Sequence, residues 1–313
     1  MASAKKLSLL VSAALASGLI MSCRPDSAVT PEPVVLDLSA QVMSLDYEDN
    51  SLFGKKADIG VFVTENGSSN VLGDNSNVHY TADFTTGTII LTPVDKPITL
   101  PEEGIRIDLA AYYPYSAELG SGDGSEYCLH ADLTDQNSLD PEMILLAQSE
   151  NRNSVLHSAM LSLKPVYAKV KVNLKAVTEV KSSSRPISVT IDGISCEADI
   201  NVLEGKYASY GAPSSTTLIR PNATSHVYEA IVLAQTVTEG TLLNVSIPEV
   251  DTAKEEKVSV GLKNIIPELK VNTQYDITVT VSPAGIEATL VGMSDLFVSD
   301  WKEDYDEVTG ETE

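Results

Sequence analysis

The sequence predicts an all-β protein made of two β-sandwich domains in tandem. Three observations favour this fold class. No long segment has helical periodicity, whereas short runs rich in Val, Ile, Thr and Tyr alternate between apolar and polar residues. Gly, Pro, Asn and Asp separate these runs. The length of 313 residues, 43% of them hydrophobic and 21% charged, is sufficient for two packed cores.

The first 22 residues have the pattern of an export signal. Lys5 and Lys6 precede an apolar stretch, Leu7–Ile20, that is too short to span a bilayer comfortably. The sequence Leu19-Ile20-Met21-Ser22-Cys23 then resembles the bacterial lipobox, in which the cysteine receives a diacylglycerol and becomes the acylated N-terminus. Several acyl chains give stable membrane attachment. The alternative is an ordinary signal peptide followed by a chance cysteine.

Residues 23–33 are predicted to be a tether between the lipid and the fold. They contain three prolines, Pro25, Pro31 and Pro33, which favour an extended backbone.

About fourteen strands follow this tether. The clearest runs from Val166 to Leu174, where Val166, Ala168, Val170, Val172 and Leu174 alternate with polar residues. One apolar and one polar face per strand indicates antiparallel sheets packed in pairs. The other predicted strands are Val34–Leu45, Ile59–Thr64, Val78–Phe84, Thr88–Leu91, Ile105–Tyr113, Met143–Ala147, Leu156–Leu163, Ile187–Ile191, Val227–Leu233, Leu242–Ile247, Lys257–Leu262, Tyr275–Val281 and Ile286–Met293.

The strand pattern is interrupted at Asn151–Ser154. We therefore expect an N-terminal domain over residues 34–154 and a C-terminal domain over residues 155–313. Lys181–Pro186 is a second plausible break.

The charge of the chain excludes several partners. The net charge is −23, and removal of residues 1–22 leaves 19 basic and 44 acidic residues, or −25. Such a surface repels phosphate backbones, so nucleic acid is not expected as a partner. It also disfavours a large basic contact with anionic lipid, so membrane attachment depends on the lipid at Cys23.

No catalytic constellation is visible, and we expect no enzyme, cofactor or metal site. The sequence has no G-x-S-x-G, H-E-x-x-H, P-loop or dinucleotide-binding motif. Ser195-Cys196-Glu197 is interpreted as structural, and Asp123–Glu126 as a solvated hairpin loop rather than a Ca²⁺ site. Tyr112–Tyr115 is typical of a strand end, with sugar stacking as the alternative. Cys128 and Cys196 are expected to be separate, although they could pair in an oxidising compartment.

The order of segments resembles the fimbrillin family of Bacteroidota, the type V pilus subunits and their tip and anchor relatives. The resemblance covers most of the mature chain. Its parts are the lipobox and tether, Val34–Leu45, Asp58–Val63, Tyr80, Leu109–Tyr115, Met143–Ala147, His157 to Ser162 leading into Val166–Leu174, Tyr275–Val281, Gly285-Ile286 and Asp300-Trp301.

This resemblance implies Greek-key, transthyretin-like sandwiches and assembly by donor-strand exchange. In that mode the first strand, with Val34, Leu36 and Leu38, is removed and a segment of another subunit takes its place. The link Asp46–Lys56 is the expected processing segment, with Lys55 and Lys56 as its basic residues. Well-known family members are cut after arginine, which this link lacks. Either a lysine-directed protease acts, or the first strand is retained, as in an anchor subunit.

Two further features concern a donor segment and candidate glycosylation sites. Leu290–Trp301 could serve as a donor segment if it detaches, whereas the acidic tail Lys302–Glu313 is a weak candidate. Asp26-Ser27-Ala28 and Asp251-Thr252-Ala253 resemble the sites that Bacteroidota glycosylate after export, so Ser27 and Thr252 are O-glycosylation candidates.

The function favoured by these features is a structural or adhesive subunit of a cell-surface fimbria, exported as a lipoprotein precursor to the outer membrane, with a tip or anchor position among its roles. The expected partners are other fimbrial subunits, the membrane through Cys23, and a host or bacterial surface glycan or protein. The alternative is a surface glycan-binding lipoprotein of a nutrient uptake system. Glycan platforms usually expose several tryptophans, and this chain has only Trp301.

Overall fold

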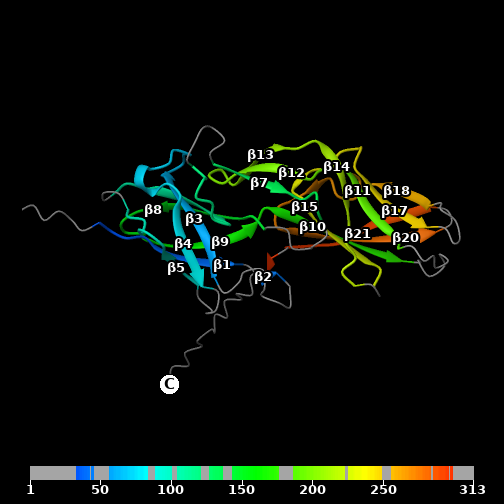
Figure 1. The fold of residues 1–313 in the computed structure, drawn as a ribbon, viewed down its shortest axis with the longest axis horizontal. Helices are drawn as coiled ribbons and strands as arrows, with labels where there is room; N and C mark the ends of the chain where they lie inside the picture. The colour runs from blue at the N-terminus through cyan, green and yellow to red at the C-terminus, as the bar shows by residue number, and fades with distance from the viewer. Residues whose placement is uncertain are drawn as a thin grey trace, which may run out of the picture. The chain divides into compact units, whose positions relative to one another are not determined.

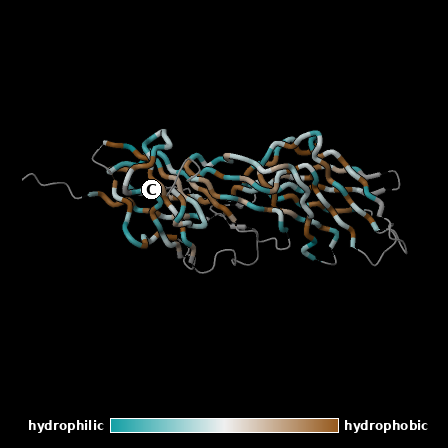
Figure 2. The backbone as a smooth tube through the Cα atoms, turned by 45° about the horizontal axis from the view of Figure 1, so that its top comes forward, coloured by the Kyte–Doolittle hydropathy of each residue, from teal (hydrophilic) through white to brown (hydrophobic). Residues whose placement is uncertain are grey.

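The computed structural model describes residues 33–42, 44–45, 56–83, 89–100, 104–120, 127–136, 143–175, 186–222, 225–248, 255–282, 285–295 and 297–298. Over these ranges the chain forms β-strands and one short 3-10 helix, η2 (Gly73–Asn75), so the all-β prediction is confirmed. Apolar and polar residues alternate along many of the strands (Figure 2). Within the described part of the chain, no helix is long and apolar enough to cross a bilayer.

Seven strands form one closed sheet (Figure 1). Their order is β1 (Asp37–Val42), β5 (Ile89–Pro93), β4 (Val78–Asp83), β3 (Lys56–Glu65), β6 (Ile107–Tyr113), β8 (Leu145–Arg152) and β9 (Ser158–Pro165), and β9 pairs with β1 to close the sheet. The inward side chains form the first hydrophobic core, which includes the fully buried Ile59, Val61 and Leu145.

Strands β3 and β6 of this sheet differ from the predicted pattern of one apolar and one polar face. In β3, Val61 faces the first core and Phe62 is buried on the opposite face. In β6, Ile107, Leu109 and Ala111 face the first core, but Ala110 and Tyr112 on the opposite face are also buried. A third, smaller cluster covers that opposite face. It consists of Phe62, Ala110, Tyr112, Leu119, Val202 and Leu203. The prediction of a polar outer face is wrong here because a loop and a later segment of the chain cover the sheet.

The second core lies between two four-stranded sheets. One sheet has the order β15 (Val227–Leu233), β10 (Tyr167–Lys175), β20 (Thr273–Ser282), β21 (Gly285–Asp295). The other has the order β14 (Pro213–Thr217), β11 (Ser188–Ser195), β17 (Leu242–Pro248), β18 (Glu255–Gly261). β10 and β20 are parallel, whereas the other pairs in these sheets are antiparallel.

A three-stranded sheet joins early and late parts of the chain. Its order is β13 (Lys206–Tyr210), β12 (Glu197–Asn201), β7 (Cys128–Asp132) (Figure 1). Short two-stranded ladders pair β16 (Gln235–Thr236) with β19 (Glu268–Leu269), and β2 (Ser44–Leu45) with β22 (Phe297–Val298).

The two cores share strands rather than lying on separate stretches of sequence. In β10, Tyr167 belongs to the first core and Ala168 to the second. In β15, Leu233 belongs to the first and Val232 to the second. The interruption at Asn151–Ser154 begins in the last two residues of β8 and ends before β9, and these strands pair with each other through Leu145 and Pro165. The division into domains at this point stays a prediction.

Cys128 and Cys196 are both free. Cys128 pairs with Asn201 at one end of the β7–β12 ladder, and Cys196 lies just before Glu197 at the other end. Their separation follows from this register.

Candidate assembly site

The first strand closes the seven-stranded sheet. β1 runs parallel to β9 through six register pairs, from Asp37↔Ser158 to Val42↔Leu163. On its other side β1 is antiparallel to β5 through Ser39↔Ile90 and Ala40↔Ile89. Because β5 and β9 do not pair with each other, β1 is the strand that joins them.

Alternate side chains of the first strand fill the core. Leu36 is 3% exposed and Leu38 and Ala40 are each 5% exposed, and all three belong to the first hydrophobic core. Val34 is half-buried and packs against the same cluster. The residues that sequence analysis assigned to the first strand therefore occupy inward positions, which agrees with a period of two.

Hydrogen bonds extend the contact of this segment beyond β1 itself. Leu36 N–H donates to the Ile98 carbonyl at 2.9 Å, and Leu100 N–H donates to the Val34 carbonyl at 2.8 Å. Asp37 N–H donates to the His157 carbonyl at 2.8 Å. Near this end, His157 Nε2 lies 3.7 Å from Asp37 Oδ2. The segment is held along its length by main-chain bonds and inward apolar side chains.

This arrangement is suited to exchange of one strand for another. Departure of β1 would leave the edges of β5 and β9 with unpaired main-chain groups and would expose the inward pockets. An extended segment of another chain with apolar residues at alternate positions could supply the same hydrogen bonds and side chains.

The predicted processing residues lie directly before β3. Lys56 is the first residue of β3 and pairs with Asp83. Lys55 and the rest of the link lie outside the described residues. The bond between Lys55 and Lys56 therefore directly precedes a paired strand, and the bond after Lys56 lies within it.

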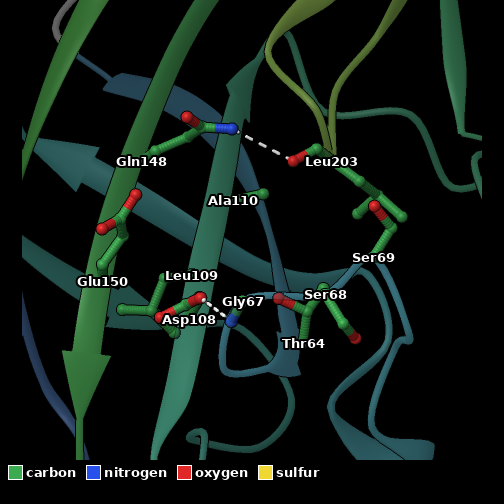
Figure 3. A pocket seen from close by; sticks show the side chains of 10 residues that line it. All are labelled: Thr64, Gly67, Ser68, Ser69, Asp108, Leu109, Ala110, Gln148, Glu150 and Leu203. Atoms are coloured by element: carbon green, nitrogen blue, oxygen red, sulfur yellow. Dashed lines mark hydrogen bonds between the residues drawn. The ribbon is translucent and has the colours of Figure 1, made fainter.

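A polar pocket lies beside the turn that follows β3 (Figure 3). Asp108 organises this region. Its carboxylate accepts hydrogen bonds from Asn66 Nδ2 at 2.8 Å, Gly67 N at 2.6 Å and Asn151 N at 2.8 Å. Partial burial acts to raise the pKa of Asp108, but the bonds from Gly67, Asn151 and Asn66 outweigh it and lower the pKa.

The hydrogen bonds that Asp108 accepts give this pocket a structural role. Gln148, on the other side of the pocket, donates from Nε2 to the Leu203 carbonyl at 3.0 Å (Figure 3). No group of three or more metal-ligating side chains occurs among the described residues. The hydrogen bonds of Asp108 thus hold the turn after β3 against the neighbouring strands.

The aromatic group Tyr112–Tyr115 is divided between interior and surface. Tyr112 is fully buried, and its hydroxyl oxygen lies 2.6 Å from Asn77 Oδ1. Tyr115 is half-buried and stacks on His79 with ring centroids 4.0 Å apart and an interplanar angle of 2°. This division agrees with the strand-end interpretation.

Ser195, Cys196 and Glu197 have structural contacts. Ser195 Oγ donates to the Gly211 carbonyl at 2.8 Å, and Ser195 N–H donates to Gln235 Oε1 at 2.9 Å. Cys196 is buried in the second core. Gln235 was not predicted as a contact, because a single glutamine in the two-residue strand β16 carries no pattern.

Several predicted sites lie outside the described residues. These are Cys23, Lys55, Ser27, Thr252, Asp123–Glu126, Trp301 and Lys302–Glu313. Their roles stay predictions.

Comparison with known proteins identifies the family. Residues 47–301 match the model of the fimbrillin-like family, which is most of the chain. In fold the chain is similar to a cell adhesion protein from Bacteroides uniformis, with 20% identity, a TM-score of 0.63, and coverage of 85% of this chain and 99% of that one. It is also similar to a cell adhesion protein from Bacteroides ovatus, with 17% identity, a TM-score of 0.59, and coverage of 86% and 99%.

A fimbrial assembly protein from Parabacteroides distasonis has the same fold at 11% identity, with a TM-score of 0.50 and coverage of 82% of this chain and 99% of that one. No curated protein matches the sequence. The chain belongs to the fimbrillin-like family of fimbrial and cell adhesion proteins, as its motif order predicted. This is a structural, non-enzymatic family of the cell surface, so the prediction that the chain is not an enzyme is confirmed.

Proposed function

We propose that this chain is a structural or adhesive subunit of a cell-surface fimbria, assembled with other subunits by donor-strand exchange. The observation that supports this proposal is the position of β1, which alone joins β5 and β9 and inserts Leu36, Leu38 and Ala40 into the core. The donor and the groove are different surfaces, so the contact can repeat from subunit to subunit as an open filament.

We further propose that the mature chain contains two Greek-key, transthyretin-like domains and enters the outer membrane as a precursor lipidated at Cys23. The presence of two cores, the second of them between two facing sheets, supports the first part. The lipobox-like residues before Cys23 support the second.

Processing, where it occurs, acts at Lys55 and Lys56. Proteases act on extended segments that can leave their hydrogen bonds, and Lys56 is paired with Asp83 in β3. We therefore expect cleavage after Lys55 to be favoured over cleavage after Lys56. Mass spectrometry of the mature surface form decides between a start at Lys56, a start at Ala57 and a retained, acylated Cys23. The last outcome identifies a subunit that keeps its first strand.

The fimbrial role is tested with purified surface fibres from the producing cell. The chain should be present in these fibres, and a Leu38→Asp variant should alter its incorporation because a charge replaces a core side chain. Asp37→Asn, at the exposed neighbouring position, is the matched control. Absence of the chain from the fibres, together with intact fibres in its deletion strain, would refute the proposal.

A further inference from the structure

The outer face of the proposed exchange site carries an unusual set of side chains. Ser39 faces outward between Leu38 and Ala40, and its register partners are Ile90 on β5 and Met160 on β9. Ile90 is 68% exposed and Met160 is 62% exposed, although each is paired with Ser39 of β1. Two large apolar side chains therefore flank a small hydroxyl on the solvent side of one sheet.

The three residues lie on the same face because the neighbouring pairs lie on the other. Ala40 pairs with Ile89 and Leu161, and Ala40 and Leu161 are buried. Side chains of directly paired residues in adjacent strands are close enough to contact each other. Serine at position 39 is too short to cover either neighbour, so the resident strand leaves both apolar side chains in water.

We infer that the outer face of this site selects an incoming strand that carries a large apolar residue at the position of Ser39. The inference rests on the proposed donor-strand exchange and names the chemistry of the donor. Such a residue would contact Ile90 and Met160 simultaneously and remove apolar surface from water. The donor sequence is therefore apolar on both faces at this point, with a large outward residue between the inward residues that replace Leu38 and Ala40.

The resident strand is matched to the core on its inward face but not on its outward face. It can thus occupy the groove during folding and still be displaced by a donor with the better outer contact. A donor with a polar or charged outward residue would gain nothing over the resident strand on this face.

The resident strand offers a direct test in the full-length chain. Ser39→Val should slow hydrogen exchange of the β1 amides by roughly two- to five-fold, because valine contacts both neighbours. Gln41→Val is the matched control: Gln41 also faces outward on β1, but its register partner on β9 is Ser162. Adding Met160→Ser to Ser39→Val should remove most of the gain.

Equal slowing by Ser39→Val and Gln41→Val would overturn the inference, since it would show only the strand preference of valine. The inference would also be overturned if Ser39→Val slowed exchange by the same factor with and without Met160→Ser. These measurements need no fibre, so they test the outward contact of position 39 with Ile90 and Met160 separately from the fimbrial proposal.

Fibres test the donor itself. A photo-crosslinking amino acid at position 160 should capture a segment of another subunit, and the residue joined to it should be large and apolar. A polar residue or glycine there would overturn the inference. Capture of the chain's own Ser39 throughout the fibres would instead refute exchange. Capture of a neighbouring subunit's sheet surface, with β1 still in place, would overturn the inference by showing that a different surface covers Ile90 and Met160.

Discussion

At the scale of single residues, Gly60 controls how β3 packs beside β6. The two strands pair through Gly60↔Tyr112, and a Cβ atom on Gly60 would overlap the ring of Tyr112. That ring cannot move freely, because its hydroxyl lies 2.6 Å from Asn77 Oδ1 and accepts the Ser116 N–H at 3.2 Å. Burial raises the pKa of Tyr112 to about 12, so the hydroxyl stays protonated at ordinary pH.

Gly60→Ala should therefore destabilise the protein by about 2 kcal/mol or more, the cost of overpacking a buried site. Denaturant unfolding measures the change. Gly261→Ala is the control, since a Cβ at Gly261 has open space around it and should change stability by less than about 1 kcal/mol. Equal effects of the two substitutions would contradict the role of Tyr112.

A second residue-scale prediction concerns Glu229, a buried acid in β15. Lys169 Nζ lies 2.8 Å from Glu229 Oε2, and Lys171 Nζ lies 3.9 Å from Oε1. The side chains of Glu229 and Lys169 are only 11% and 13% exposed. Glu229→Ala would leave Lys169 without this partner and should cost about 3 kcal/mol in denaturant unfolding.

The control for Glu229 is the exposed ion pair between Lys263 and Glu239, at 2.8 Å. Glu239→Ala should change stability by less than about 1 kcal/mol. If both substitutions had the same small effect, the burial of the Lys169–Glu229 pair would not matter for stability.

At the scale of strands and turns, Asp108 makes the stability of one region depend on pH. Its pKa is lowered in the folded chain, so it contributes stability above the pKa of an unfolded aspartate, about 3.9, and this contribution is lost as the pH falls through the lower folded value. We expect the protection of the Gly67 and Asn151 amides, which is the slowing of their hydrogen exchange relative to that of an unstructured peptide at the same pH, to decrease below about pH 4.

Asp108→Asn should remove this acid dependence at Gly67 and Asn151 while leaving distant strands unchanged. An unaltered pH profile in the variant would show that other groups control the turn.

Much of this strand pattern could be predicted, and the failures have a physical reason. Val166–Leu174 alternates clearly because one face of β10 lies in the second core. β13 and β14 were missed because nearly all their residues are exposed, as in the Pro213–Thr217 segment, so burial imposed no apolar period. β7 was missed because Ala131 is the only buried one of its five residues. β12 was missed because Glu, Asp and Asn, which are depleted from strands, occupy three of its five positions.

The candidate site likewise has parts that could be predicted from the sequence and parts that could not. The inward residues Leu36 and Leu38 follow from alternation, and the family resemblance gave their role. The neighbours of β1 could not be predicted, because a parallel contact between β1 and β9 joins residues more than a hundred positions apart. Ile90 and Met160 consequently gave no signal in the sequence.

At the scale of the whole molecule, the shared strands should make the described fold unfold as a unit. β12 shows the connection: Ala198 and Ile200 belong to the first core, and Cys196, directly before the strand, belongs to the second. Disruption of one core therefore displaces residues that support the other.

Leu243→Ala in the second core should cost about 3 kcal/mol, and the loss should appear equally in both cores. Hydrogen exchange near the denaturation midpoint, read at β4 in the first core and β17 in the second, measures this. Two separate transitions, with only β17 affected, would show that the cores fold independently.

The ladder between β1 and β9 also has a mechanical consequence. Tension applied to Pro33 along the axis of β1 acts in shear, because the main-chain hydrogen bonds lie across the strand and the six register pairs share the load. Under shear, many of these hydrogen bonds must break together, whereas peeling the strand from one end breaks them one after another. A segment seated in the same place would resist a pull along its length far better than one lifted sideways, so the direction of force would decide whether subunits stay joined.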